Sequence, residues 1–326
     1  MNRIAVIGGG AWGTALAQVA ARAGREVLLW AMEDDVVAAI NTAHENPAFL
    51  PGIALDPAIR ATGDLDVIGG CDAWLVVTPA QQMRSVLERA PRCDVPRILC
   101  SKGIEEHGGE LLHKVAAEAC PGAPVAVLSG PTFAHEVARG LPTAVTLAAE
   151  DRESGKRIRE ALAQPEFRIY LSNDVAGAEI GGAVKNVLAI ACGVVEGRGL
   201  GQNARAALIA RGFAEMTRFG VAMGARPETL AGLSGLGDLV LTCSSTSSRN
   251  YSLGKGIGQG RSANELMADR RTVAEGAFTA PVLARIARAR GIDMPIVDAV
   301  DSLLKGASID SVVEDLLARP PKSEGV

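Results

Sequence analysis

Lys185 is a lysine in an unusually apolar setting. It lies within Gly181-Gly182-Ala183-Val184-Lys185-Asn186-Val187-Leu188-Ala189-Ile190, a segment with helical periodicity. A desolvated ammonium near a second one, such as Lys102, is expected to have a pKa below its usual value of about 10.4, which suits a general acid–base. Small residues one turn away predict space for a ligand beside it. The alternative is a lysine whose stem is buried and whose ammonium reaches solvent.

Two further candidate segments follow predicted strands. Lys102 comes directly after the predicted strand 97–100, and Ser129-Gly130-Pro131-Thr132-Phe133-Ala134 comes after the predicted strand 125–128. Ligands of open α/β sheets bind outside the carboxyl ends of the strands. We therefore expect both segments to face a ligand, although an ordinary surface lysine and a plain turn are equally compatible with position alone.

A third group lies in a Gly/Ser/Thr-rich stretch, residues 232–250, in which we predict a long loop rather than helices. The stretch ends in Ser248-Arg249-Asn250, where the planar fork of the arginine and two flanking hydrogen-bonding side chains suit a phosphate dianion. Asp238, in the same stretch, is expected to orient Lys185 or to accept a hydrogen bond from a substrate hydroxyl. A flexible loop with one acid and one base is the alternative.

A glycine motif opens the chain. The predicted strand Arg3–Ile7 runs into Gly8-Gly9-Gly10-Ala11-Trp12-Gly13, which satisfies G-x-G-x-x-G between a strand and a helix. Its glycines suit a tight turn, the approach of a pyrophosphate and close helix packing, so the motif predicts NAD or NADP as cofactor. At the tip of the second predicted strand, Met32 supplies neither an acid for the ribose nor a cation for a 2′-phosphate, which leaves the choice between the two open.

The elements that must position these residues change character near residue 175. Up to about Tyr170, short apolar strands alternate with helical patterns, which predicts an α/β fold with an N-terminal doubly wound Rossmann domain over residues 1–174. Beyond it, a 3.6-residue period without strand patterns predicts an all-helical C-terminal domain over residues 175–326. The other predicted strands are 26–30, 73–77 and 143–147, and the predicted helices are 13–23, 34–43, 83–90, 110–119, 153–163, 178–195, 204–223, 279–290, 295–305 and 309–318.

Composition excludes several classes of protein. The 326 residues are 48% hydrophobic and 21% charged, which predicts a two-domain globular protein rather than a disordered or collagen-like chain. A formal charge of -4 gives no basic field for nucleic acid, so we expect no such partner.

Cysteine and histidine usage points to a reducing compartment without a metal. The 6 cysteines are far apart and mostly lie in apolar runs, which predicts buried reduced thiols, and the 4 histidines show no metal-ligand spacing. We expect neither an export signal nor integral membrane association, and therefore a cytoplasmic protein.

Taken in order, these motifs resemble the bacterial NAD(P)-dependent glycerol-3-phosphate dehydrogenase family over nearly the whole chain. The resembling stretches also include Asn203-Ala204-Arg205, Val273-Ala274-Glu275-Gly276 and Met294-Pro295-Ile296. The resemblance implies a Rossmann domain, a helical domain of the 6-phosphogluconate-dehydrogenase type, and an active site in the cleft between them. The implied reaction interconverts dihydroxyacetone phosphate and sn-glycerol 3-phosphate, a phospholipid precursor, by hydride transfer with NAD(P)H.

The resemblance also assigns roles to individual residues. It makes Lys185 the proton donor and acceptor, with Lys102 and Asp238 beside it as catalytic residues. The implied substrate contacts are Lys102, Gly130, Thr132, Lys185, Asp238, Ser248, Arg249 and Asn250. The implied dinucleotide contacts are Gly8, Gly10, Ala11, Trp12, Gly13, Met32, Lys102, Ala134, Arg249, Val273 and Glu275. Family members are often dimeric, so a homodimer is a further expectation.

Two other functions fit the same architecture. The nearest is another two-domain NAD(P)-dependent hydroxyacid dehydrogenase, since many chemistries share one fold. The more remote is a non-catalytic dinucleotide sensor, against which the presence of both Lys102 and Lys185 argues.

Overall fold

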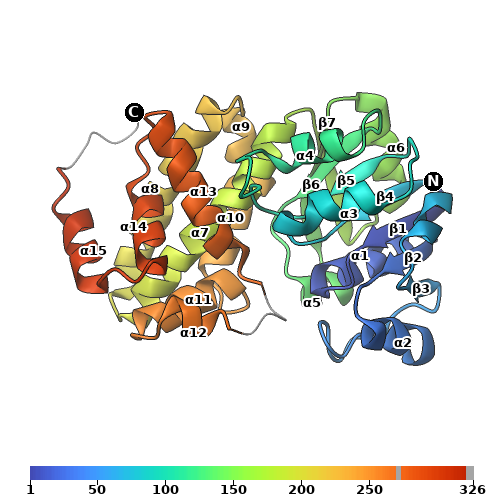
Figure 1. Cartoon of the computed structure of the whole chain (residues 1–326), viewed down its shortest axis with the longest axis horizontal. Coiled ribbons are helices and arrows are strands. Elements are labelled where there is room, and N and C mark those ends of the chain that lie inside the picture. The colour runs from blue at the N-terminus through green and yellow to red at the C-terminus, as the bar shows by residue number, and fades with distance from the viewer. Residues whose placement is uncertain (269–272, 321–326) are drawn as a thin grey trace.

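A mostly parallel sheet flanked by helices forms one half of the molecule, and helices alone form the other (Figure 1). The computed structural model describes residues 1–268 and 273–320. The strands are β1 Arg3–Ile7, β2 Glu26–Trp30, β3 Ile59–Thr62, β4 Ala73–Val76, β5 Arg97–Leu99, β6 Val125–Ser129, β7 Thr143–Ala149 and β8 Phe167–Ser172. The helices of this half are α1 Ala11–Arg22, α2 Asp34–Ala43, η1 Asp66–Gly70, η2 Ala80–Gln82, α3 Met83–Arg89, α4 Leu112–Ala119, α5 Ala134–Ala138 and α6 Arg152–Leu162.

The sheet has the order β3-β2-β1-β4-β5-β6-β7-β8, and every neighbouring pair is parallel except β6 and β7. The order reverses between β1 and β4, which is where α/β sheets of this kind bind ligands at the carboxyl ends of their strands. The predicted doubly wound α/β domain is confirmed. Two strands escaped prediction, β3 and β8, and both lie at sheet edges, where alternating buried and exposed residues give a weaker signal.

Both faces of the sheet are buried. Along β1, Ile4 and Val6 belong to one apolar cluster, whereas Ala5 and Ile7 belong to the cluster on the opposite face. This is why the strand reads as a continuous apolar run. All six cysteines are free, and all except Cys93 are buried, in agreement with the predicted reduced thiols.

The helical half is built around α7, Val175–Gly197. It packs against α8 Gly201–Ala222, α10 Asp238–Cys243, α11 Arg249–Gly258 and α13 Glu275–Ala289. The other elements are α9 Pro227–Leu230, η3 Leu233–Gly237, α12 Ala263–Leu266, α14 Pro295–Leu304 and α15 Ile309–Leu317. By length and composition α7 could cross a membrane, but its most apolar stretch is 100% buried inside the protein, as befits the core helix of this half.

The prediction of a long loop over residues 232–250 is wrong. This stretch forms η3, a π-helical turn, then α10 and the start of α11. Its glycines serve close approach rather than chain freedom, because a side chain on Gly235 would collide with the Leu230 carbonyl. Ser248 caps α11, its Oγ accepting from the Tyr251 N–H at 3.2 Å.

Glu215 of α8 ties α14 to the helical core. Its carboxylate is 1% exposed and accepts the N–H groups of Ile296 at 2.8 Å and Val297 at 3.3 Å, in the first turn of α14. We expect Glu215→Ala to destabilise the fold by about 1–3 kcal/mol, since it leaves buried N–H groups unpaired. Denaturant unfolding, with the exposed Glu88→Ala as control, measures this loss.

The contribution of Glu215 also depends on pH. Burial raises the pKa of its carboxyl to about 7, above the ordinary value of 4.5. Because the folded state holds this proton more tightly than the unfolded state, the stabilising contribution is fully present below the ordinary pKa and is lost as the pH rises through 7. The stability gap between wild type and Glu215→Ala should therefore narrow towards alkaline pH, and an equal stability of the two at every pH would contradict the capping role.

Candidate active site

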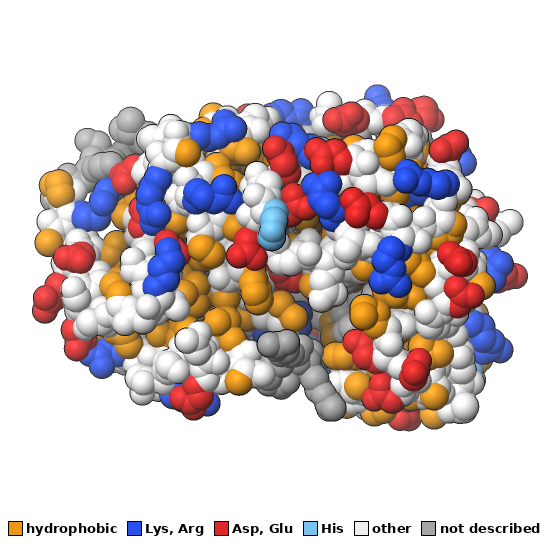
Figure 2. Space-filling view, viewed as in Figure 1, with side chains coloured by type: hydrophobic (Ala, Val, Ile, Leu, Met, Phe, Trp, Pro, Cys, Tyr) orange, Lys and Arg blue, Asp and Glu red, His pale blue; other side chains and the backbone are white. Residues whose placement is uncertain are grey.

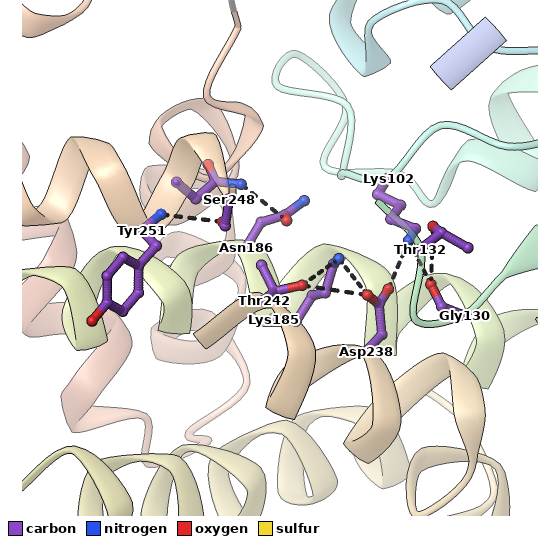
Figure 3. A network of polar contacts seen from close by, with 10 residues as sticks. Lys102, Gly130, Thr132, Lys185, Asn186, Asp238, Thr242, Ser248 and Tyr251 are labelled. Atoms are coloured by element: carbon purple, nitrogen blue, oxygen red, sulfur yellow. Dashed lines mark hydrogen bonds and ion pairs between the residues drawn. The ribbon is translucent and has the colours of Figure 1, made fainter. Parts of the chain in front are cut away.

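Three charged side chains from the two halves meet beyond the carboxyl ends of β5 and β6 (Figure 3). Asp238 Oδ1 lies 2.6 Å from Lys185 Nζ, and its Oδ2 lies 2.7 Å from Lys102 Nζ. Lys185 comes from the middle of α7, Asp238 begins α10, and Lys102 follows β5. The three residues predicted to be catalytic are thus in direct contact, and one carboxylate orients both ammonium groups.

Thr242 completes the surroundings of Lys185. Its Oγ1 accepts a hydrogen bond from Lys185 Nζ at 2.8 Å and donates one to Asp238 Oδ1 at 3.3 Å. An ammonium has three hydrogens to donate, and Asp238 and Thr242 take two, so one is left for a ligand. From sequence, Thr242 is one of the polar residues of the stretch 232–250 but has no assigned role, because only a helix through Asp238 puts a residue four positions later on the same face.

The electrostatics of this cluster favour proton transfer near neutral pH. Lys185 is 5% exposed, and burial lowers its pKa to about 8 from an ordinary 10.5. The carboxylate of Asp238 opposes this shift, whereas the positive charge of Lys102 adds to it. Two ammonium groups around one carboxylate leave a net positive charge, which suits an anionic substrate or a developing oxyanion.

Glycines bring the elements of this cluster together. A side chain on Gly181 would collide with the carbonyl of Ser234 in η3, and a Cβ on Gly182 would lie 3.1 Å from Lys102 Cγ. The prediction that small residues beside Lys185 leave space for a ligand is therefore wrong for these two positions. They instead allow η3 and the stem of Lys102 to approach α7 closely.

The turn after β6 faces the same cluster, as predicted. The Gly130 carbonyl accepts from Lys102 Nζ at 3.1 Å and from Thr132 Oγ1 at 3.3 Å. A Cβ on Gly130 would lie 2.9 Å from Val145 Cα, so the turn can sit against β7 only with glycine there. Ser129 Oγ is buried and has no hydrogen-bond partner among the described residues.

The predicted phosphate-binding residues lie at the start of α11. Arg249 is exposed, and its guanidinium makes no hydrogen bond or ion pair with residues 1–268 or 273–320. Ser248 Oγ is occupied as the helix cap but retains a hydrogen to donate. Asn250 is 7% exposed and donates from Nδ2 to Asn186 Oδ1 at 3.0 Å. Asn186 was not predicted as a site residue, since nothing in its sequence context separates it from an ordinary helix residue.

The glycine motif has the geometry that a pyrophosphate needs. Gly8 has a φ of 128°, and a side chain on Gly13 would collide with the Gly8 carbonyl, so α1 packs tightly onto β1. Gly10, by contrast, faces open space, and no side chain caps the first turn of α1. Its free N–H groups fit a phosphate. Asn46, which the sequence analysis missed, donates to the Gly9 carbonyl at 2.8 Å and fixes the loop from outside.

The remaining predicted dinucleotide residues lie at three places in the fold. Met32 is 65% exposed beyond β2, Ala134 begins α5, and Val273 precedes α13. Glu275 joins the two halves, because its Oε1 accepts from the Ala80 N–H at 3.3 Å. Its Oε2 is buried without a partner among the described residues, and burial raises its pKa to about 7. An unsatisfied carboxylate oxygen here fits a hydrogen-bond donor from a bound dinucleotide.

The surface is hollowed between the two halves on the face seen in Figure 2. A separate cavity of about 610 Å³ lies at the opposite, amino-terminal edge of the sheet, where Met1, Asp72, Asp94 and Arg157 are among its lining residues. None of the predicted site residues lines this cavity. The candidate site is therefore the cluster around Lys185 between the two halves.

A sheet domain with a dinucleotide-binding glycine motif, a helical domain, and a buried lysine beside a partly buried one where they meet define a two-domain NAD(P)-dependent dehydrogenase. A family model described as NAD-dependent glycerol-3-phosphate dehydrogenase N-terminus matches residues 3–155, and one described as its C-terminus matches residues 174–314. The chain belongs to the glycerol-3-phosphate dehydrogenase family.

Individual relatives agree with this assignment. The chain is 64% identical to the glycerol-3-phosphate dehydrogenase [NAD(P)+] of Erythrobacter litoralis, covering 98% of this chain and 97% of the relative. It is 58% identical to that of Caulobacter vibrioides, covering 99% of each chain. The crystal structure of glycerol-3-phosphate dehydrogenase from Coxiella burnetii has a TM-score of 0.93 at 38% identity, covering 98% of this chain and 99% of that one. A D-mandelate dehydrogenase shares only the fold, at 14% identity and a TM-score of 0.65.

Proposed function

We propose that this protein reversibly reduces dihydroxyacetone phosphate to sn-glycerol 3-phosphate with NADH or NADPH, and that Lys185 is its proton donor and acceptor. The observation that carries the proposal is the contact of Lys185 and Lys102 with one buried carboxylate, Asp238. The buried Lys185 and the partly buried Lys102, whose charges Asp238 offsets in part, suit a carbonyl that becomes an alkoxide during reduction.

Binding and orientation of the substrate follow from the charges. The exposed fork of Arg249, which makes no hydrogen bond or ion pair with a described residue, takes the phosphate, with Ser248 and Asn250 beside it. Gly130 and Thr132, in the turn after β6, line the same side as Lys102. The carbonyl oxygen then lies near Lys185 and Lys102, where one hydrogen of the Lys185 ammonium is free.

The dinucleotide, when bound, supplies the hydride. The first turn of α1, whose N–H groups have no side-chain cap, would hold its pyrophosphate, with Gly8, Gly10, Ala11, Trp12 and Gly13 as the proposed contacts. Met32, Ala134, Val273 and Glu275, with Lys102 and Arg249, complete its proposed contacts. During reduction Lys185 gives a proton to the substrate oxygen. Asp238 and Thr242 hold Lys185 Nζ in position before and after the transfer. In the reverse direction neutral Lys185 takes the proton from the hydroxyl.

Three finer points belong to the proposal. The domain boundary is placed between residues 174 and 175, because β8 ends at Ser172 and α7 begins at Val175. A cytoplasmic location is supported by the six free cysteines, and the absence of integral membrane association by the burial of α7 inside the protein. A homodimer is supported by the family resemblance alone.

A direct assay tests the function. Purified protein is mixed with dihydroxyacetone phosphate and either NADH or NADPH, and the loss of absorbance of the reduced nicotinamide is followed. We expect oxidation of at least one dinucleotide that depends on the phosphate substrate. Turnover of an unphosphorylated 2-oxo acid instead would favour the hydroxyacid dehydrogenase alternative, and binding of dinucleotide without any turnover would favour the sensor.

The role of Lys102 can be separated by pH. Its charge lowers the pKa of Lys185, so Lys102→Met should move that pKa upwards. Reduction requires protonated Lys185, and the alkaline decline of kcat for reduction should therefore shift to higher pH in the variant. Lys156→Met removes a partly exposed lysine that is paired with Glu153 and lies outside the site, and serves as the control. An unchanged decline in Lys102→Met would contradict the coupling of the two lysines.

A further inference from the structure

A chain of buried hydrogen bonds links three helices beside the lysine cluster. The Gly276 N–H, in the first turn of α13, donates to Asn250 Oδ1 at 2.9 Å. Asn250, in α11, then donates from Nδ2 to Asn186 Oδ1 of α7 at 3.0 Å. The two asparagines are 7% and 6% exposed, so water does not compete freely for these bonds.

The direction of this chain is fixed at one end. An asparagine amide can place either its oxygen or its nitrogen towards a neighbour, whereas a backbone N–H can only donate. Gly276 therefore requires the oxygen of Asn250, and the nitrogen of Asn250 in turn requires the oxygen of Asn186. As a result the Asn186 amide nitrogen points away from Asn250, and it makes no hydrogen bond with a described residue (Figure 3).

Gly276 can occupy this place because it has no side chain. A Cβ there would lie 2.5 Å from the Asn186 carbonyl oxygen and 2.9 Å from Asn250 Oδ1. Its N–H is also one of the N-terminal amides of α13 that have no acceptor within the helix, and no side chain of the preceding Ala274 caps them. The partial positive charge at the start of α13 therefore acts on Asn250 Oδ1, which takes the place of a side-chain cap.

We propose that Gly276 is a positioning residue for the substrate: its N–H fixes the polarity of Asn250 and Asn186, so that Asn186 turns an N–H donor towards an anionic ligand next to Lys185. This inference rests on the proposed function, which places a phosphate ester beside the start of α11. It also explains how the first turn of α13 serves two sites, since the neighbouring Glu275 is a proposed dinucleotide contact.

Replacement of Asn250 by aspartate tests the polarity. The carboxylate of Asn250→Asp can still accept from Gly276 but has no hydrogen for Asn186, whose amide should then rotate and present its oxygen to the ligand. We expect KM for dihydroxyacetone phosphate to rise by roughly 10- to 100-fold, the range for a hydrogen bond to a charged group. As the pH falls, a protonated carboxyl can donate to Asn186 again, so KM of the variant relative to wild type should recover. Asn264→Asp adds the same charge at an exposed position and should change neither.

A double-mutant cycle separates polarity from the added charge. In Asn250→Asp the donor of Asn186 is already turned away, so adding Asn186→Ala should raise KM little further, although Asn186→Ala alone raises it in wild type. Losses that multiply would overturn the proposal, because they would mean that the two amides act independently. Gly276→Ala keeps its N–H, but the added Cβ would collide with the Asn186 carbonyl and displace this N–H from Asn250. The variant should therefore also raise KM and be insensitive to the added Asn186→Ala. If it does not fold, the cycle at Asn250 still decides.

Two readouts keep this test apart from the function itself. Wild-type turnover of dihydroxyacetone phosphate tests the proposed function. The absence of turnover would contradict the proposed substrate, whereas the hydrogen-bond chain is tested by the variants. Affinity for NADH, measured by fluorescence on the Asn250 and Asn186 variants, should stay unchanged. An affinity for NADH that falls in parallel with KM would show that the chain only holds the domain structure together, and would contradict a role in substrate positioning.

Discussion

Lys185→Met is expected to lower kcat for reduction of dihydroxyacetone phosphate by a factor on the order of 10³ while leaving the affinity for NADH nearly intact. General acid–base catalysis contributes about 10²–10⁴-fold. Among the described residues, Lys185 is the buried group positioned for this role, because its Nζ is held by both Asp238 and Thr242. Methionine fills a similar volume, so the packing of α7 is preserved. Steady-state kinetics and NADH fluorescence titration measure the two quantities.

A second substitution at the same position distinguishes proton transfer from charge. Lys185→Arg keeps a positive charge but does not release a proton near neutral pH, so we expect it to be almost as inactive as Lys185→Met. Activity close to wild type in Lys185→Arg would show that charge alone suffices. Substantial turnover by Lys185→Met would remove Lys185 from the chemistry altogether.

Arg249→Ala is expected to reduce kcat/KM for dihydroxyacetone phosphate by roughly 10- to 150-fold, mainly through KM. The estimate corresponds to the loss of about 1.5–3 kcal/mol, the range for hydrogen bonds to charged groups. Arg249→Lys should recover part of the loss, since it restores a point charge but not the planar fork that pairs with two phosphate oxygens. The exposed Arg261→Ala, which loses only an ion pair with Glu265, is the control. An unchanged KM in Arg249→Ala would move the phosphate site elsewhere.

The elements that could be predicted are those whose signals are local. β1 and its glycine motif follow from a short apolar run that ends in residues suited to a tight turn, and α2 was predicted over the range it occupies, Asp34–Ala43. Lys185 could be found because a charged residue in an apolar helix is rare enough to draw attention. Its proximity to Lys102 was expected from the family resemblance, which implies that both lysines lie in an active site between the domains, and Asp238 indeed contacts both.

The elements that could not be predicted depend on contacts between distant segments. In η3, glycine serves backbone contact with Leu230, and composition alone does not distinguish this from a flexible loop. The role of Thr242 beside Lys185 was missed for the same reason, since its place in the site depends on the helix α10. Asn46 and Asn186 act through partners far away in the sequence, and neither has a residue type or spacing that marks it.

The pH dependence of kcat in both directions tests the central claim, that Lys185 with a pKa of about 8 carries the proton. Lys185 is protonated below this pKa and neutral above it, and because the pKa is lowered, the change falls within the pH range of an ordinary assay. For wild type we predict that kcat for reduction falls as the pH rises through about 8, while kcat for oxidation of sn-glycerol 3-phosphate rises over the same range. Profiles that stay flat in both directions, with the chemical step shown to limit the rate by a deuterium isotope effect, would contradict Lys185 as the proton donor and acceptor.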